Sequence, residues 1–459
     1  MHIEQLYTGC LSQGAYYIES DGEVAVIDPL RETKPYLERA ERDNATIKYV
    51  FETHFHADFV SGHVSLSEAT GAPIIYGPTA NPTFDAYIAK DNEEFKVGKL
   101  TIKALHTPGH TLESTTYLLK DENGKDHAIF TGDTLFLGDV GRPDLAQKSN
   151  EITQEDLAGM LFDSLRNKIM PLNGDVIVYP AHGAGSACGK NMMKETIDTL
   201  GNQKKINYAL RKDMTKAEFI QEVTEGLMPP PAYFPLNVKM NKEGYDSLAS
   251  LIEKASLVTP QKFEEIANST GAIVLDVRAQ QDFFEGHVPC SIFIGIDGGF
   301  APWVGALVKD TKQPLLIVAP EGREEETITR LSRVGFDNVL AFLDGGMEAW
   351  KTSGREIDTM HSVSAETLKT ELKNASPVFD VRKDSEFENE HIPSATHTSL
   401  EFINQYLNEF PSDKPFYIHC AGGYRSVIAN SILKSRGIHN GIDVAGGFKA
   451  IKEAGIAVE

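Results

Sequence analysis

The chain has 459 residues, of which 41% are hydrophobic and 24% are charged, values that are ordinary for a globular protein. This length predicts about three domains, and the composition excludes an intrinsically disordered chain. The formal net charge of −22 argues against nucleic acid as a partner, because phosphate binding needs a basic face.

The first ten residues, MHIEQLYTGC, contain neither a basic segment nor an apolar one, and no apolar run in the chain reaches membrane-spanning length. We therefore expect neither export nor membrane insertion. The four cysteines lie far apart and form no CxxC pair, which argues against a disulfide framework and a thiolate zinc site. A reducing cytoplasm fits this cysteine usage.

The first half of the chain alternates short apolar runs with polar turns, a pattern that predicts β-strands. The predicted strands cover residues 23–29, 49–53, 72–77, 100–105, 127–133 and 175–180. Polar or histidine-rich turns follow the carboxyl ends of these runs. We expect that arrangement to place several ligand side chains along one edge of a sheet.

Histidine and aspartate side chains recur in these turns. In THFHADFVSG, His54 and His56 are two positions apart, so that on a strand end or an extended loop both can face one point. HTPGHT adds His110, FTGDTLF adds Asp133 and YPAHGAG adds His182, each after an apolar run. One histidine alone usually packs in the core or faces solvent. Five such residues in one setting predict a metal site, because imidazole and carboxylate groups are common ligands.

The strings THFHAD, HTPGHT, FTGDTLF and PAHG resemble the successive metal motifs of the metallo-β-lactamase fold, over about residues 1–235. The resemblance implies an αββα sandwich, in which hydrolases such as glyoxalase II bind two metal ions. The family pattern HxHxDH has a histidine directly after the aspartate, whereas Phe59 follows Asp58 here. A second metal site would keep only Asp58, His182 and a share of Asp133.

The longer strings THFHADFVSGH and TGDTLFLGDVGRPDL strongly resemble those of persulfide dioxygenases. This resemblance implies one Fe(II) per chain, bound by His54, His110 and Asp133. Two histidines and one carboxylate form the ligand set of non-haem Fe(II) oxygenases, which leaves coordination positions open.

The same resemblance implies roles for the residues around the iron. His56, Asp58 and His182 would orient the ligands and the substrate, or supply part of a second metal site. Arg142, in GDVGRPDL, is a candidate for binding a carboxylate of the thiol carrier or the developing sulfite. A salt bridge is the other interpretation of Arg142.

A proline-rich stretch, MPPPAYFPLNVKMNKEGYDS, ends the first domain. Beyond it the sequence repeats itself: IVLDVRAQQDFFEGHVP corresponds to PVFDVRKDSEFENEHIP, 104 residues later. PLLIVAPEGR corresponds to PFYIHCAGGYRS, and LDGGMEAW to VAGGFKAI, both at a spacing of 101 residues. Blocks that keep this register predict two modules of a usual single-domain size.

Each module alternates β-branched runs with helical patterns, for example PLLIVA followed by REEETITRLSRVGF. This alternation predicts a parallel sheet with helices on both faces. The fold class expected for the whole chain is therefore α/β. The expected domains are residues 1–240, 258–357 and 361–459.

The second module carries a candidate nucleophile. HCAGGYRS places Cys420 in a glycine-rich turn between the apolar run PFYI and the helical pattern SVIANSILKSRG. Backbone N–H groups at a helix N-terminus, with Arg425 nearby, can stabilise negative charge on the sulfur. The equivalent residue in the first module is Ala319, and Cys290 lies elsewhere, in HVPCSI.

The string CAGGYRS, with DVR and EHIP upstream, resembles the active loop of rhodaneses, sulfurtransferases that carry a cysteine persulfide. A phosphatase-like relative is disfavoured because its loop is longer. The resemblance implies that the second module is an active rhodanese domain, and that the first has the same fold without the thiol.

Together the resemblances imply that an iron site converts R-SSH and O₂ to R-SH and sulfite. A persulfide on Cys420 would pass sulfane sulfur to sulfite or receive it from thiosulfate, in sulfide detoxification. The thiol carrier, which could be glutathione, coenzyme A, cysteine or another small thiol, is not determined by the sequence. The acidic surface and the silent middle module suggest a scaffolding role or a homo-oligomer.

Two other functions stay open at this point. A binuclear thioester hydrolase is the alternative enzyme, and Phe59 argues against it. A persulfide carrier or sensor without enzymatic activity is the other alternative. The complete set of His54, His110 and Asp133 argues against that second one.

Overall fold

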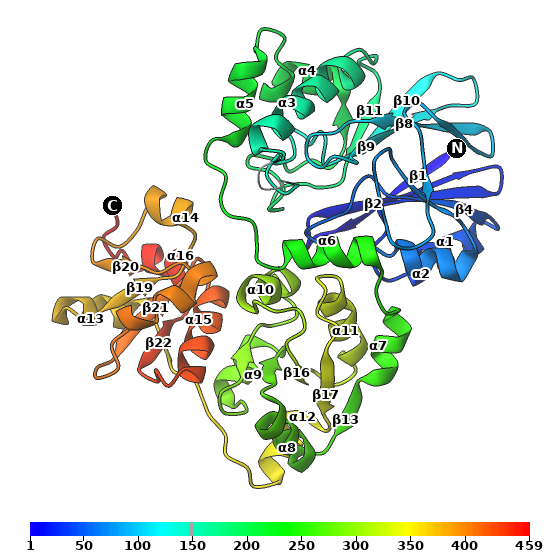
Figure 1. Cartoon of the computed structure of the whole chain (residues 1–459). Coiled ribbons are helices and arrows are strands. Elements are labelled where there is room, and N and C mark those ends of the chain that lie inside the picture. The colour runs from blue at the N-terminus through cyan, green and yellow to red at the C-terminus, as the bar shows by residue number, and fades with distance from the viewer. Residues whose placement is uncertain (147–150) are drawn as a thin grey trace. The chain divides into compact units, whose positions relative to one another are not determined.

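The computed structural model describes residues 1–146 and 151–459 (Figure 1). The chain forms two compact units. The first comprises Met1–Leu248 with Leu331–Gly335, and the second comprises Ala249–Arg330 with Phe336–Glu459. Within the described part of the chain, no helix is long and apolar enough to cross a membrane.

The first unit begins with a six-stranded sheet whose strand order follows the sequence. The strands are β1 (His2–Thr8), β2 (Gln13–Ser20), β3 (Glu23–Ile27), β4 (Thr46–Phe51), β5 (Ile74–Tyr76) and β6 (Tyr87–Ile88). The pairs from β1 to β3 are antiparallel, and those from β3 to β6 are parallel.

A second six-stranded sheet of the same unit has the order β12-β11-β10-β9-β8-β7. Its strands are β7 (Glu94–Val97), β8 (Leu100–His106), β9 (Thr115–Lys120), β10 (Asp126–Gly132), β11 (Ile177–Pro180) and β12 (Asp198–Thr199). Only β10 and β11 pair in parallel in this sheet.

The two sheets pack face to face around a shared aromatic core. The ring of Tyr16 lies 4.9 Å from that of Phe130, and the ring of Phe51 lies 4.7 Å from that of Tyr117. Alternate residues of a strand serve different layers: Ile18 faces this core and its neighbour Tyr17 packs under the outer helices. Strands covered on both faces must be apolar on both faces.

Helices cover the outer face of each sheet. The first unit contains α1 (Lys34–Arg42), α2 (His63–Thr70), α3 (Gln154–Ser164), η1 (Leu165–Ile169), α4 (Leu200–Ile206), η2 (Tyr208–Leu210), α5 (Lys216–Thr224) and α6 (Phe234–Glu243). Helices α1 and α2 pack on the first sheet, and α3, α4 and α5 pack on the second. The αββα sandwich is therefore confirmed.

The second unit contains two five-stranded sheets with equivalent strand orders, β13-β17-β16-β14-β15 and β18-β22-β21-β19-β20. The strands of the first are β13 (Ser256–Val258), β14 (Ile273–Asp276), β15 (Ile292–Phe293), β16 (Leu315–Val318) and β17 (Val339–Leu343). Those of the second are β18 (Ser362–Val363), β19 (Val378–Asp380), β20 (Ala395–His397), β21 (Phe416–His419) and β22 (Gly441–Val444). Every pairing is parallel, so the repeated sequence is a repeated α/β fold, as predicted.

Helices connect these parallel strands, as the alternating pattern predicts. Around the first sheet they are α8 (Pro260–Thr270), α9 (Gln280–Glu285), α10 (Phe300–Leu307), α11 (Glu324–Ser332) and α12 (Gly346–Thr352). Around the second they are α13 (Ala365–Glu371), η3 (Leu372–Asn374), α14 (Asp384–Asn389), η4 (Leu400–Gln405), η5 (Leu407–Glu409), α15 (Tyr424–Ser435) and α16 (Gly447–Glu453). A further helix, α7 (Leu248–Lys254), precedes β13.

Candidate functional site

Three side chains from separate strand ends meet in the first domain. His54 follows β4, His110 lies after β8, and Asp133 follows β10. The Nε2 atoms of His54 and His110 lie 3.9 and 3.3 Å from Asp133 Oδ2. All three side chains are buried, and one ligand atom of each lies within 4.8 Å of the others. The three residues expected to bind iron are thus brought together.

Protein oxygens orient the two imidazole rings. His54 Nδ1 lies 3.0 Å from Thr53 Oγ1, and His110 Nδ1 lies 2.8 Å from the carbonyl oxygen of Arg142. Burial, reinforced by neighbouring imidazoles, holds the pKa of His54 well below its ordinary value, which keeps the ring neutral. His54 Nε2 and both Asp133 carboxylate oxygens have no hydrogen-bond partner among the described residues. Such buried polar atoms are costly unless satisfied, and a cation bound between them would satisfy them.

A second group lies on the other side of Asp133. His182 Nε2 is 3.3 Å from Asp58 Oδ2 and 3.6 Å from Asp133 Oδ1. Burial alone would lower the pKa of His182, but Asp58 and Asp133 outweigh it and raise the pKa well above its ordinary value. The thiol of Cys188 belongs to the same group, with its pKa raised by burial to about 12. Cys188 was not predicted as a site residue. The one feature of the sequence that pointed to it is its position six residues after His182.

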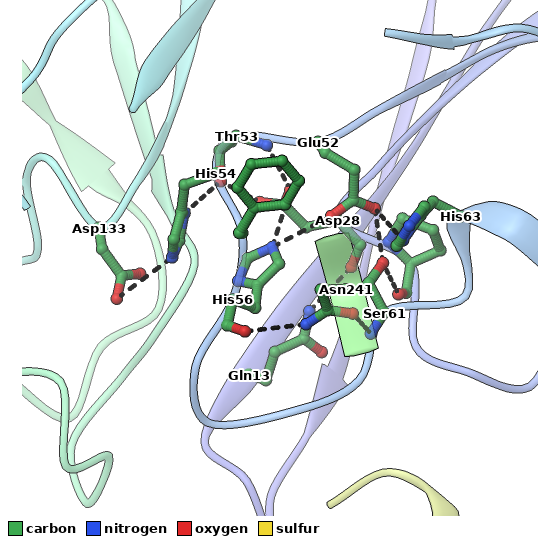
Figure 2. Close-up of polar contacts among 12 residues, drawn as sticks. Gln13, Asp28, Glu52, Thr53, His54, His56, Ser61, His63, Asp133 and Asn241 are labelled. Carbon is green, nitrogen blue, oxygen red and sulfur yellow. Dashed lines mark hydrogen bonds and ion pairs between the residues drawn. The ribbon is translucent and has the colours of Figure 1, made fainter. Parts of the chain in front are cut away.

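His56 faces a different group, a buried pair of carboxylates (Figure 2). Its Nε2 atom lies 3.1 Å from Asp28 Oδ1 and 3.5 Å from Glu52 Oε2. Asp28 also accepts hydrogen bonds from the backbone N–H and the hydroxyl of Thr53. Burial and the neighbouring Asp28 raise the pKa of Glu52 well above its ordinary value. Asp28 and Glu52 end strand patterns in the sequence, but they were not predicted as site residues.

Phe59 supplies a buried ring where the family pattern has a histidine. Its centroid lies 4.3 Å from that of His56, with the two rings inclined by 35°. The phenyl ring offers no ligand atom and packs against the imidazole that contacts Asp28. Phe59 therefore supports the position of His56 instead of binding a metal ion.

The side chain of Asn241 on α6 fastens the loop that carries these residues (Figure 2). Its amide nitrogen donates to the carbonyl oxygens of His56 and Phe59, and its oxygen accepts from the backbone N–H of Ser61, each at 2.8 Å. The three backbone partners belong to buried residues. One helix side chain thus holds the loop at three points.

We expect Asn241→Ala to lower the free energy of unfolding of the first domain by about 3–5 kcal/mol, because three buried backbone groups lose their partners. Calorimetric and urea unfolding of the full chain measure this change. Lys239→Ala on the same helix is the matched control, because this exposed side chain should change stability by no more than about 0.5 kcal/mol. A loss below about 1 kcal/mol for Asn241→Ala would contradict the assigned role of the amide.

The guanidinium of Arg142 is bonded within the protein. Its Nε and one terminal nitrogen lie 2.6 and 2.7 Å from the Asp144 carboxylate oxygens, and the same terminal nitrogen donates to the carbonyl oxygen of Met228. This geometry matches the salt-bridge interpretation. Substrate binding by Arg142 stays a prediction, while its carbonyl oxygen orients His110.

In the second unit, Cys420 lies between β21 and the first turn of α15. Its buried sulfur accepts a hydrogen bond from the N–H of Gly423 at 3.1 Å. Gly423 has φ of 104°, a conformation that glycine adopts without steric penalty. The guanidinium of Arg425 forms a bidentate pair with Glu386, at 2.5 and 2.8 Å.

The equivalent loop of the other five-stranded sheet carries no thiol. Ala319 directly follows β16, as Cys420 follows β21. Cys290 is exposed and lies two residues before β15, not in the loop that follows β16. The four cysteines of the chain are all free.

Comparison with known proteins identifies the domains. The Metallo-beta-lactamase superfamily model matches residues 8–182, and the Rhodanese-like domain model matches residues 259–353 and 364–454. A solved structure described as a metallo-beta-lactamase from Staphylococcus aureus is 28% identical, with a TM-score of 0.64. The alignment covers 75% of this chain and 98% of that one.

Curated proteins with two different activities are similar to part of this chain. The persulfide dioxygenase ETHE1 of Homo sapiens is 28% identical over 227 residues, which are 48% of this chain and 78% of the relative. The cytoplasmic hydroxyacylglutathione hydrolase of Arabidopsis thaliana is 34% identical over 138 residues, or 29% of this chain. That match spans 53% of the hydrolase, about half its length. The relatives therefore include both an oxygenase and a hydrolase.

Proposed function

We propose that this chain, a metallo-beta-lactamase domain followed by two rhodanese domains, oxidises a low-molecular-weight persulfide with O₂ at an Fe(II) site and exchanges sulfane sulfur at Cys420. The observation that carries the proposal is the convergence of His54, His110 and Asp133 beside a position where Phe59 replaces a ligand. The similarity to a persulfide dioxygenase supports it. With one water molecule supplying the third oxygen atom of sulfite, the products would be a thiol and sulfite.

The residues of the first domain prepare the site in three ways. His54 and His110 each direct one ring nitrogen toward Asp133, because protein oxygens hold the other nitrogen. The low pKa of His54 keeps that ring available as a neutral ligand. Burial of all three side chains excludes water and strengthens electrostatic interactions. Iron held there would supply the redox chemistry that O₂ requires.

The second rhodanese domain would carry out sulfur transfer by covalent catalysis. The sulfur of Cys420 attacks the outer sulfur of thiosulfate, a new S–S bond forms, and sulfite leaves with the electron pair of the broken bond. The N–H of Gly423 points at this sulfur and stabilises the negative charge that returns to it. The opposite direction, from the Cys420 persulfide to sulfite, uses the same groups.

A thioester hydrolase is the second candidate function. The group of Asp58, His182 and Cys188 favours it, because these side chains could hold a second metal ion next to Asp133. The similarity to a hydroxyacylglutathione hydrolase also favours it. The number and kind of bound metal ions separate the two candidates.

We expect elemental analysis of the purified chain to find close to one iron per chain, because position 59 offers no ligand. Phe59→His should raise the total metal content above that of the parent, whereas the control Phe59→Leu should leave it unchanged. Two tightly bound zinc ions per parent chain, together with thioester hydrolysis, would contradict the dioxygenase proposal.

A further inference from the structure

The side chains of Cys420, Ser426 and Asp443 form a buried series. The hydroxyl oxygen of Ser426, on α15, is 3.6 Å from Cys420 Sγ and 2.6 Å from Asp443 Oδ1. The second carboxylate oxygen of Asp443, at the end of β22, accepts from the hydroxyl of Ser362 at 3.1 Å. Cys420, Ser426 and Asp443 are each no more than 1% exposed. Ser426 therefore connects a buried thiol to a buried carboxylate.

The silent module lacks all three members of this series. The residues 101 positions earlier are Ala319, Glu325 and Phe342. The correspondence is structural as well, because Phe342 pairs with Ile317 across β17 and β16 as Asp443 pairs with Ile418 across β22 and β21.

Other parts of the repeat are retained. The ion pair of Asp276 with Arg278 recurs as that of Asp380 with Arg382. Ion pairs that stabilise the fold are thus present in both modules. The Ser426 hydroxyl and the Asp443 carboxylate occur only in the module that has the thiol. We therefore associate them with the chemistry of the thiol and not with the stability of the fold.

The remaining charged groups around the thiol are already paired or neutral. Arg425 is paired with Glu386, so its positive charge is largely compensated. Burial lowers the pKa of the neighbouring His419, which keeps that ring uncharged. The charged and titratable groups on the surrounding elements include Arg425, Glu386, Asp380, Arg382, His419, His361, Tyr417, Tyr424, Lys434 and Lys449. The hydrogen bonds found for Ser426 among the described residues include no side chain of this set.

We propose that Ser426 and Asp443 carry the thiol proton of Cys420 away and return it during sulfur transfer. The S–H proton passes to the Ser426 oxygen as the Ser426 hydroxyl proton passes to Asp443 Oδ1, so the charge moves from the carboxylate to the sulfur. When an acceptor later removes the sulfane sulfur, the electron pair returns to Cys420 Sγ and the proton returns by the same route. No oxidant or reductant is needed.

Asp443 acts through Ser426 and is therefore a positioning residue, whereas Ser426 touches the reacting sulfur. Burial raises the pKa of Asp443 to about 6, against the weaker opposing effect of its two hydroxyl donors. The carboxylate is then ionised at neutral pH and can accept a proton. The inference rests on the proposed sulfurtransferase function of the third domain.

The test is thiosulfate:cyanide sulfur transfer by the full chain, measured from pH 5 to pH 9. In the parent, kcat/KM for thiosulfate should fall as the pH drops through about 6, because protonated Asp443 cannot accept the thiol proton. Asp443→Asn keeps the shape of the side chain and should remove this acid limb, with a loss of about 10²-fold at pH 7.5. Ser426→Ala should cause the same loss, and the double variant should lose no more than either single variant.

Ser362→Ala is the matched control, because it removes a hydroxyl from the other oxygen of the same carboxylate and leaves the route to the sulfur intact. It should keep its rate at pH 7.5 within about 3-fold of the parent. If Asp443→Asn does not fold, Ser426→Ala alone tests the proton route, because it should also remove the fall in kcat/KM at low pH. The proton route is overturned if the variants keep the fall in kcat/KM at low pH, or if the losses add in the double variant. In that case an active parent still supports the sulfurtransferase function. An inactive parent overturns both.

Discussion

His110→Ala is expected to abolish oxygen uptake with a persulfide, by more than about 100-fold, and to leave thiosulfate:cyanide sulfur transfer unchanged. The substitution removes one of the two imidazoles that lie beside Asp133 Oδ2, and it leaves His54 as the other, while His182 still faces Oδ1. If these residues bind Fe(II) as proposed, the two that remain would hold it more weakly. Cys420 lies in another domain and keeps its loop. An oxygen electrode and a thiocyanate assay on one preparation measure both activities, and elemental analysis should show the loss of iron.

His127→Ala provides the matched control for this experiment. His127 is a half-buried residue of β10, the strand that precedes Asp133, and it belongs to none of the candidate metal groups. This control should retain iron and both activities. Loss of both activities in folded His110→Ala protein would show that the two sites are not independent.

Cys420→Ser is expected to abolish sulfur transfer, by at least about 10³-fold, while oxygen uptake and iron content stay at the level of the parent. A serine hydroxyl of nearly the same volume can accept the N–H of Gly423 but cannot replace the thiolate as nucleophile or carry a sulfane sulfur. If Cys420 persulfide normally consumes the sulfite made at the iron site, the variant should release sulfite in place of thiosulfate. Thiol labelling followed by chromatography measures both products.

Cys290→Ser is the control for that substitution, because this exposed thiol lies outside the loop equivalent to that of Cys420. It should make the products of the parent in the same ratio. Unchanged enzymatic thiosulfate from Cys420→Ser, after correction for the spontaneous reaction of sulfite with persulfide, would show that the third domain does not process the product of the first.

The sequence predicts the parts of this molecule that are periodic or repeated. In the first unit the apolar runs locate β3, β4, β5, β8, β10 and β11, although the run at residues 49–53 forms β4 only as far as Phe51. The last two residues of this run, Glu52 and Thr53, lie beyond the end of the strand and begin the loop that carries His54 and His56. Strands β1, β2, β6, β7, β9 and β12 lie outside the predicted ranges. The register of the repeat likewise predicts two parallel sheets and the missing thiol at Ala319.

The parts that the sequence does not predict depend on tertiary packing. Cys188 reaches Asp58 only because the loop after His182 folds back on the site. Asp28 and Glu52 end ordinary strand patterns, and only the packing of the sheet turns both toward His56. No local sequence pattern predicts these clusters of side chains, because their members are far apart in the sequence or share no fixed spacing.

Oxygen consumption on addition of a persulfide is the decisive measurement for the proposal that the first domain oxidises persulfides. The experiment uses the 459-residue chain loaded with iron, with the persulfides of glutathione, coenzyme A and cysteine in separate runs and with thioesters of the same thiols in parallel. We expect at least one persulfide to be consumed with an equimolar amount of O₂, with formation of sulfite or thiosulfate, while the thioesters stay intact. Hydrolysis of the thioesters, with no oxygen uptake on any persulfide, would contradict the proposal.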